Sequence, residues 1–143
     1  FNHESPRRGE NFVSSKIING VLSIALGEES TLALGNLDAT RDWGHAKDYV
    51  RAMHKIINHT TPEEFIVATG ETHSVRDLCE IVFRKLGMNY KDYVIQDPKF
   101  MRPEELKYLK GDSSKTREIL GWKPEYTFET MLEEMINKWE KEL

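Results

Sequence analysis

The sequence has few of the features that mark secreted or membrane proteins. It has one cysteine, Cys79, so no intrachain disulfide can form, and such usage is typical of a reducing compartment. No apolar run is long enough to cross a membrane, and no signal sequence precedes the first residue, Phe1. We therefore expect a cytoplasmic protein with no membrane partner, excised from a longer chain. We also expect Cys79 to be a small buried hydrophobe within a helix.

The charge balance lacks the basic surplus of a nucleic-acid-binding protein. Lysine and arginine number 20 against 24 aspartates and glutamates, which gives a formal net charge of −4. Non-specific binding to DNA or RNA needs excess cationic side chains that displace counterions from phosphates. The composition thus argues against a nucleic-acid partner, and any anion must be bound by basic residues that gather locally.

Several cofactor and catalytic motifs are also absent. The nine glycines are scattered singly, without the spacing of a dinucleotide fingerprint or a P-loop. No Gly-x-Ser-x-Gly motif occurs, and the five histidines show no metal-ligand spacing with cysteine or carboxylates. We expect no metal site, and the chain by itself cannot cradle a pyrophosphate on a glycine loop.

An alternation of strand and helix patterns extends over the 143 residues, a length suited to one domain. Short strands are predicted at 31–34 and 93–95. Helices are predicted to start at capping residues, which are Asn11, the region of His45, the Ser74–Asp77 capping box, Asp112 and Thr127. Strands that alternate with helices indicate the α/β class.

The run FIVAT, residues 65–69, is the most apolar strand candidate. It lies between Pro62 and Gly70 and contains no charged residue. A continuous apolar run of this length is typical of a strand buried on both faces. We predict a parallel strand there, flanked by the helices that start near His45 and Ser74.

Basic side chains are concentrated near the N-terminus, at Arg41 and in the loop that contains Arg102. The planar fork of arginine suits phosphate oxygens, so loop arginines that meet at one crevice would clamp a diphosphate. Each residue also has a simpler interpretation. Arg41 could pair with Asp42 or another carboxylate, Lys16 could lie on a solvated helix face, and Trp43 is more often a packing residue than a stacking platform.

Four longer stretches carry a family resemblance. They are FNHESPRRGENFV, LGNLDATRDWGHAKDYV, FIVATGETHSVRDL and RPEELKYLKGDSSKTREILGWKP, and they cover nearly the whole chain. In sequence and order they resemble the C-terminal half of the GDP-mannose 4,6-dehydratases, members of the extended short-chain dehydrogenase/reductase superfamily. The resemblance implies the C-terminal part of a Rossmann-type α/β fold, in which residues 1–143 form a single substrate-binding region and the N-terminal cofactor domain is absent.

The resemblance also implies an activity for the full-length parent. Such an enzyme is a lyase that converts GDP-mannose to GDP-4-keto-6-deoxymannose by NADP-dependent oxidation, dehydration and reduction. It implies NADP as cofactor, GDP-mannose as small-molecule partner and a homo-oligomer for the parent.

The chain departs from the family pattern in its catalytic residues. The family's glycine fingerprint and its catalytic Thr, Glu and Tyr-x-x-x-Lys precede the NHES segment, and no tyrosine of this chain is followed by lysine at that spacing. No catalytic residue is therefore assigned, and the chain alone is predicted to be inactive.

The resemblance carries binding roles to particular positions. For substrate these are Asn2 at the sugar nucleotide, Val13 and Lys16 in the diphosphate pocket, Leu34, Gly35 and Asn36 as the guanine and ribose wall, Arg41 at the diphosphate, and Arg102 with Glu105 as a second clamp. The cofactor positions are His3 and Arg8. Asp42 is expected to be structural, as a partner of Arg41 or a cap of the next helix.

Two other interpretations remain open. One is a different sugar-nucleotide dehydratase, epimerase or reductase, which the NHESPRRG segment disfavours. The other is a non-catalytic module that binds nucleotide sugars or docks a partner.

Overall fold

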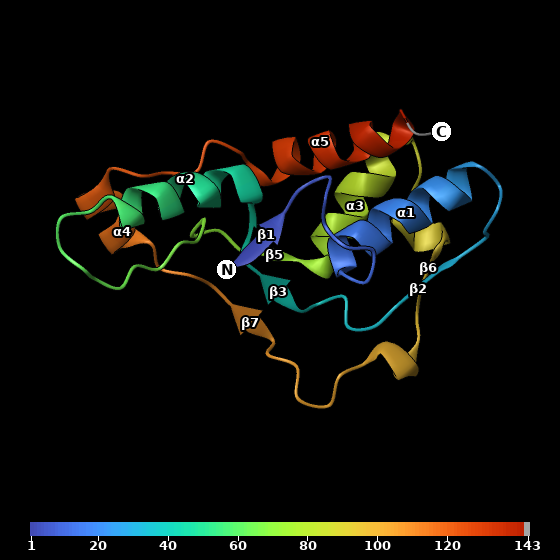
Figure 1. Cartoon of the computed structure of the whole chain (residues 1–143). Helices are drawn as coiled ribbons and strands as arrows, with labels where there is room; N and C mark the ends of the chain where they lie inside the picture. Colours follow the sequence, from blue (N-terminus) through green and yellow to red (C-terminus); the bar gives the residue numbers. More distant parts are fainter. Residues whose placement is uncertain (142–143) are drawn as a thin grey trace.

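The computed structural model describes residues 1–141 and contains alternating short strands and longer helices (Figure 1). The helices are α1 (Val13–Ala25), α2 (Ala46–Ile57), α3 (Val75–Lys85), α4 (Ser114–Leu120) and α5 (Phe128–Glu140), with short 3-10 helices at Tyr90–Asp92 and Pro98–Phe100. The strands are β1 (Asn2–Glu4), β2 (Leu32–Leu34), β3 (Thr40–Arg41), β4 (Trp43–His45), β5 (His73–Ser74), β6 (Val94–Gln96) and β7 (Tyr108–Leu109).

The strands form three small sheets. β1 pairs with β4, and β2 pairs with β6, both in parallel. In the third sheet β3 is central, antiparallel to β5 and parallel to β7. These pairings connect segments that lie far apart in the sequence, and with the intervening helices they confirm the predicted α/β class.

The main hydrophobic core lies among three helices. α1, α3 and α5 lie side by side on one side of the molecule (Figure 1), and α1 contacts both others. Their inward-facing side chains are almost fully buried, among them Ile17, Val21, Leu78, Phe83, Leu132 and Met135. Cys79 lies in this core, where burial raises the pKa of its thiol to about 12, so the expected small buried hydrophobe is confirmed.

A second, smaller cluster joins α2 to the C-terminal region. Tyr49 and Ala52 of α2 pack with Trp122, all three nearly inaccessible to solvent. The helical spacing of Val50, Met53 and Ile57 predicted α2 correctly, but that apolar stripe faces outward and Ile57 is 82% exposed. Periodicity therefore identified the helix but not its buried face.

The buried carboxylate of Asp48 joins α2 to the segment before α5. It accepts hydrogen bonds from the guanidinium of Arg51 at 2.7 Å and from the backbone N–H groups of Glu125 and Tyr126 at 3.0 and 3.1 Å. Its own carbonyl accepts the indole N–H of Trp122 at 2.8 Å. This one residue thereby holds the second cluster together.

The predicted strand at residues 65–69 is wrong, because no residue of this segment pairs with a strand in the described part of the chain. Two of its backbone carbonyls accept hydrogen bonds from side chains of α4. Thr116 donates to Ile66 O at 2.5 Å, and Arg117 donates to Thr69 O at 2.6 Å. The N-terminal amine of Phe1 donates to Val67 O at 3.3 Å. A strand needs a neighbouring backbone, and in the described residues side chains occupy that place. Ile66 is accordingly 51% exposed rather than buried.

Two predicted helix caps also differ. Helix α1 starts after Phe12 without a side-chain cap, so Asn11 is not its N-cap. Ser113 occupies the N-cap position of α4, while the Asp112 carboxylate accepts from the Ser114 N–H at 3.0 Å. The Ser74–Asp77 capping box and the Thr127 cap are confirmed.

We predict that Asp48→Asn lowers the free energy of unfolding by about 2–4 kcal/mol, because an amide cannot accept from three donors that face a buried carboxylate. The measurement is urea denaturation followed by far-UV circular dichroism. Asp38→Asn is the control, since the Asp38 side chain is 74% exposed and only pairs with Arg76 at the surface. Its effect should stay below about 1 kcal/mol. Equal losses in the two variants would contradict the prediction.

Candidate functional site

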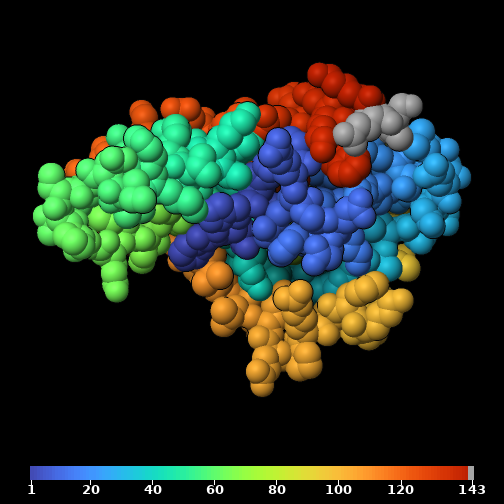
Figure 2. Space-filling view, in the orientation of Figure 1, coloured from blue at the N-terminus to red at the C-terminus, as the bar shows by residue number. Residues whose placement is uncertain are grey.

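A cleft of about 450 Å³ opens between the start of α1, the ends of β1, β2 and β3, and the segment 100–105. Every predicted site residue except His3 lines it, although these residues come from separate parts of the chain. In the space-filling view, the gold and orange segment around residues 100–110 projects below the blue N-terminal region (Figure 2). The tertiary fold thus brings the predicted substrate residues together.

Arg41 is held in one orientation at the wall of the cleft. Its Nη1 donates to the carbonyls of Thr40 and Leu106 at 2.8 and 2.6 Å, and its Nη2 lies 3.3 Å from Glu105 Oε1. The alternative of an internal ion pair is therefore realised, with Glu105 and not with Asp42. Arg41 lines the cleft, and an anion bound there could replace Glu105 as the partner of its Nη2.

Lys16 extends from α1 over an aromatic ring. Its ammonium lies 3.7 Å from the centre of the Phe100 ring, a cation–π distance. Partial burial lowers the pKa of Lys16, the charge of Lys99 lowers it further, and Asp97 opposes the shift. A cation that has lost part of its hydration is suited to receive a bound anion.

Among the residues that line the cleft, the buried carboxylate of Glu4 pairs with Arg8. Glu4 accepts a short hydrogen bond from the hydroxyl of Ser14, and its Oε1 lies 3.4 Å from Arg8 Nε. Burial raises the pKa of Glu4, while Ser14 and Arg8 lower it. The guanidinium of Arg8 lies over the ring of Phe12 at 3.6 Å. Arg8 is therefore held between a carboxylate and an aromatic ring.

Gly35 allows the loop 98–105 to close over the strand wall. A Cβ built on Gly35 would lie 2.4 Å from the carbonyl oxygen of Phe100, a distance that side chains essentially never show. Any larger residue would push the Phe100 segment outward. The wall at 34–36 thus depends on a residue without a side chain.

His3 does not reach the cleft. Its ring packs edge-on against Tyr49, with 4.5 Å between ring centres, and its Nδ1 lies 2.8 Å from Phe1 O. Strand alternation explains this placement, because successive side chains point to opposite faces and Asn2 and Glu4 face the cleft.

Sequence reasoning missed the cleft residues Glu4, Phe12 and Phe100. The only available signal was their closeness in sequence to Arg8 and Arg102, since a lone glutamate or phenylalanine carries no spacing pattern. Trp43 is 4% exposed and stacks on Phe128, so its packing interpretation holds.

In the described residues no group of three or more potential ligands could hold a metal ion. No helix of this part of the chain could cross a membrane.

The α/β architecture of the chain matches parts of longer solved structures. The whole chain superposes on 47% of RMD from Pseudomonas aeruginosa complexed with NADPH, with a TM-score of 0.89 and 24% identity. It covers 42% of dTDP-glucose 4,6-dehydratase from Bacillus anthracis in complex with NAD, with a TM-score of 0.82 and 20% identity. At such identities these likenesses define the fold.

The sequence comparison is more specific. A family profile described as GDP-mannose 4,6 dehydratase matches residues 1–135, and the chain belongs to this family. It is 48% identical to GDP-mannose 4,6 dehydratase 2 of Arabidopsis thaliana over 138 residues, which is 96% of this chain and 37% of that protein. It is 44% identical to the human GDP-mannose 4,6 dehydratase over 154 aligned positions, 96% of this chain and 41% of the relative. The chain thus spans about two fifths of the length of these curated relatives.

We predict that Lys99→Gln raises the pKa of Lys16, because it removes a nearby positive charge. NMR titration of the Lys16 side chain measures this directly. Lys85→Gln, on α3 and paired with Glu133, is the control that should leave the pKa of Lys16 unchanged. A Lys16 titration curve that is the same in Lys99→Gln as in the wild type would contradict the prediction.

The sign of the linked stability effect follows from the lowered pKa. The unfolded state keeps the proton of Lys16 to higher pH than the folded state, so the desolvated charge costs stability below the folded pKa. This cost disappears as the pH rises through the ordinary lysine value. Lys99→Gln should therefore increase stability at neutral pH rather than lower it.

Proposed function

We propose that this chain is the substrate-binding portion of a GDP-mannose 4,6-dehydratase, which converts GDP-mannose to GDP-4-keto-6-deoxymannose. The observation that carries the proposal is the cleft, where basic side chains from four separate segments meet. Arg8, Lys16, Arg41 and Arg102 line it together with only two carboxylates, Glu4 and Glu105. The relatives of the chain carry the name of this activity.

The chemistry of the walls fits a nucleotide diphosphate sugar. Arg41 and Arg102, with the lysine of α1, would bind the diphosphate through charge-assisted hydrogen bonds. The Leu34–Asn36 wall and the Phe100 ring would cover the base and ribose, since binding sites combine apolar surface with a few polar groups. Asn2 and Val13 would border the sugar and the nucleotide at the inner end.

The cofactor proposal is limited by what these residues can hold. The solved structure of RMD is a complex with NADPH. We propose NADP as the cofactor of the full-length parent of this chain, where it would supply hydride transfer. Of the two expected contacts, Arg8 lines the cleft and His3 does not. The described residues therefore fit at most one edge of a cofactor site, and no chemical step is assigned to them.

A different nucleotide specificity is the main competing function, because the fold also occurs in enzymes of dTDP and UDP sugars. Competition between GDP, UDP and dTDP for the cleft separates these possibilities. A preference for GDP supports the dehydratase proposal. The homo-oligomer remains a prediction from the resemblance, and the cytoplasmic location remains a prediction from the cysteine content and the lack of a signal sequence.

We predict that Arg41→Ala weakens GDP binding by roughly ten- to a hundredfold, because a charge-assisted hydrogen bond contributes about 1.5–3 kcal/mol. Arg41→Lys should recover only part of the affinity, since an ammonium lacks the planar fork. Isothermal titration of the chain and of the full-length protein measures both.

Arg7→Ala is the matched control for loss of charge. Arg7 is exposed and lies outside the cleft, one residue before Arg8. It should bind GDP within about twofold of the wild type. Unchanged affinity in Arg41→Ala would remove Arg41 from the site, and absence of GDP binding by the wild type would contradict the proposed function.

We also predict that the purified chain, supplied with NADP and GDP-mannose, produces no 4-keto sugar. Hydride transfer needs a nicotinamide held against the sugar, and the sequence has neither a glycine fingerprint nor a Tyr-x-x-x-Lys pair. An assay for the 4-keto product tests this, with a full-length relative as the positive control. Sustained turnover by the chain alone would overturn the assignment of catalysis to other parts of the parent.

A further inference from the structure

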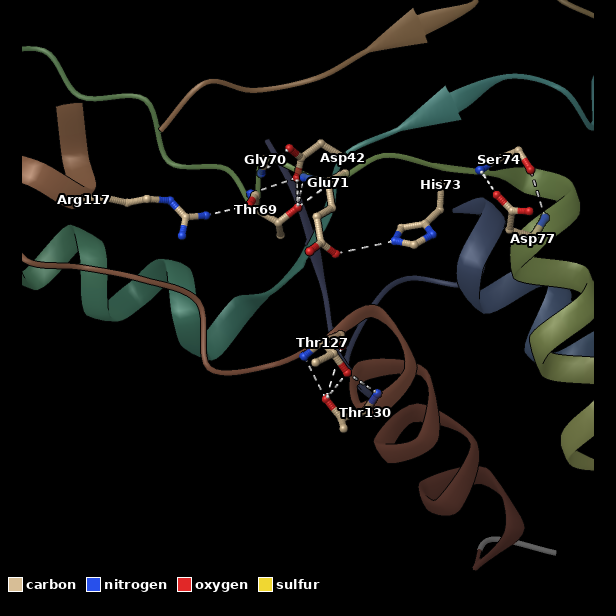
Figure 3. Close-up of polar contacts among 10 residues, drawn as sticks. All are labelled: Asp42, Thr69, Gly70, Glu71, His73, Ser74, Asp77, Arg117, Thr127 and Thr130. Atoms are coloured by element: carbon tan, nitrogen blue, oxygen red, sulfur yellow. Dashed lines mark hydrogen bonds and ion pairs between the residues drawn. The ribbon is translucent and has the colours of Figure 1, made fainter. Parts of the chain in front are cut away.

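The carboxylate of Asp42 lies directly after β3, the central strand of the three-stranded sheet, and is fully buried. Its Oδ1 accepts from the backbone N–H and the hydroxyl of Thr69 at 2.9 and 2.7 Å. Its Oδ2 accepts from the N–H groups of Gly70 and Gly111 at 2.9 and 3.3 Å. In Figure 3 the Asp42 carboxylate lies beside Thr69 and Gly70, and dashed lines mark its hydrogen bonds to them. One side chain therefore satisfies four donors from two distant segments.

These donors belong to the chain on both sides of the central strand. Thr69 and Gly70 precede β5, whereas Gly111 follows β7. A Cβ on Gly111 would lie 2.1 Å from the Cβ of Ala68, so only glycine permits the two segments to approach this closely. Asp42 thus joins the ends of both flanking strands to the end of β3.

The same strands carry the anion-binding wall of the cleft. Arg41 is the last residue of β3, and it donates to Leu106 O and lies against Glu105 in the segment that leads into β7. The Thr40 N–H donates to Lys107 O at 2.9 Å. A shift of β7 along β3 would therefore move the segment that carries Arg102 relative to Arg41.

We propose that Asp42, although it does not line the cleft, is a positioning residue that sets the distance between Arg41 and the segment 102–105, which carries Arg102 and Glu105. This inference rests on the proposed function for its ligand. Two-residue strands supply few ladder hydrogen bonds, so their register depends on additional contacts. The buried carboxylate supplies these contacts on both sides at once.

The test is Asp42→Asn, which keeps the side-chain size but turns an amide N–H₂ toward backbone N–H donors. We expect GDP affinity, measured by isothermal titration, to fall about tenfold because the cationic groups no longer converge. In an Arg41→Ala background the same substitution should cost clearly less, since the two residues act on one contact. Equal costs in both backgrounds would overturn the inference.

Asp48→Asn is a matched control. Asp48 is also a buried carboxylate that accepts two backbone N–H groups, but it anchors the segment before α5 and does not line the cleft. It should lose stability and keep GDP affinity within about twofold. Equal weakening by the two variants would reduce Asp42 to a general stabiliser and overturn its positioning role.

A ligand-free readout separates this inference from the proposed function. In Asp42→Asn the Thr40 amide, which donates to Lys107 O, should exchange with solvent faster than in Asp48→Asn. If the wild type binds no GDP, the proposed function fails, and the exchange rate alone decides whether Asp42 controls the β3–β7 register. Should Asp42→Asn fail to fold, Thr69→Val keeps the backbone donors to Asp42 and removes the hydroxyl, which donates to Asp42 and also bonds locally to the backbone of Glu71. Unchanged Thr40 exchange in that variant would overturn the inference.

Discussion

The shortness of the strands is the physical constraint on which this structure depends. The central sheet is built from strands of two residues, and such ladders contain too few backbone hydrogen bonds to hold three distant segments in place. Buried carboxylates supply the missing acceptors. Asp42 serves the sheet beside the cleft, and Asp48 serves the junction between α2 and the segment before α5. Each carboxylate is costly to bury, so each must be fully hydrogen-bonded.

The helical core and the cleft divide the molecule by chemistry. α1, α3 and α5 bury apolar side chains against one another and provide a rigid body. The cleft lies where α1 begins and where strands end, so backbone groups and loop side chains rather than core residues form its walls. Lys16 links the two parts, because its own helix is packed in the core while its ammonium reaches the Phe100 ring. The cationic groups are therefore placed by elements that cannot easily move.

The part of the family sequence that this chain spans agrees with the division into a helical core and a cleft. A chain that spans about two fifths of its relatives contains the cleft but lacks the motifs that hold a dinucleotide. Within the cleft, positive charge predominates although the whole chain is acidic, with a net charge of −4. We propose that the local positive charge serves to bind an anion, whereas the net negative charge of the whole chain keeps its surface hydrophilic.

The sequence by itself determined the α/β class and the helix positions to within a few residues, and its resemblance to a family indicated most of the residues around the cleft. Capping residues, apolar spacing and the NHESPRRG and RDW segments are local signals, so they can be read without knowing the fold. Only the tertiary structure decided which faces are buried, that residues 65–69 lie unpaired, and that His3 packs on Tyr49 away from the cleft. It also decided that Arg41 meets Glu105, and that Asp42 joins segments on both sides of β3. These outcomes depend on contacts between residues far apart in the chain, and no local pattern encodes which distant backbone group a buried carboxylate will meet.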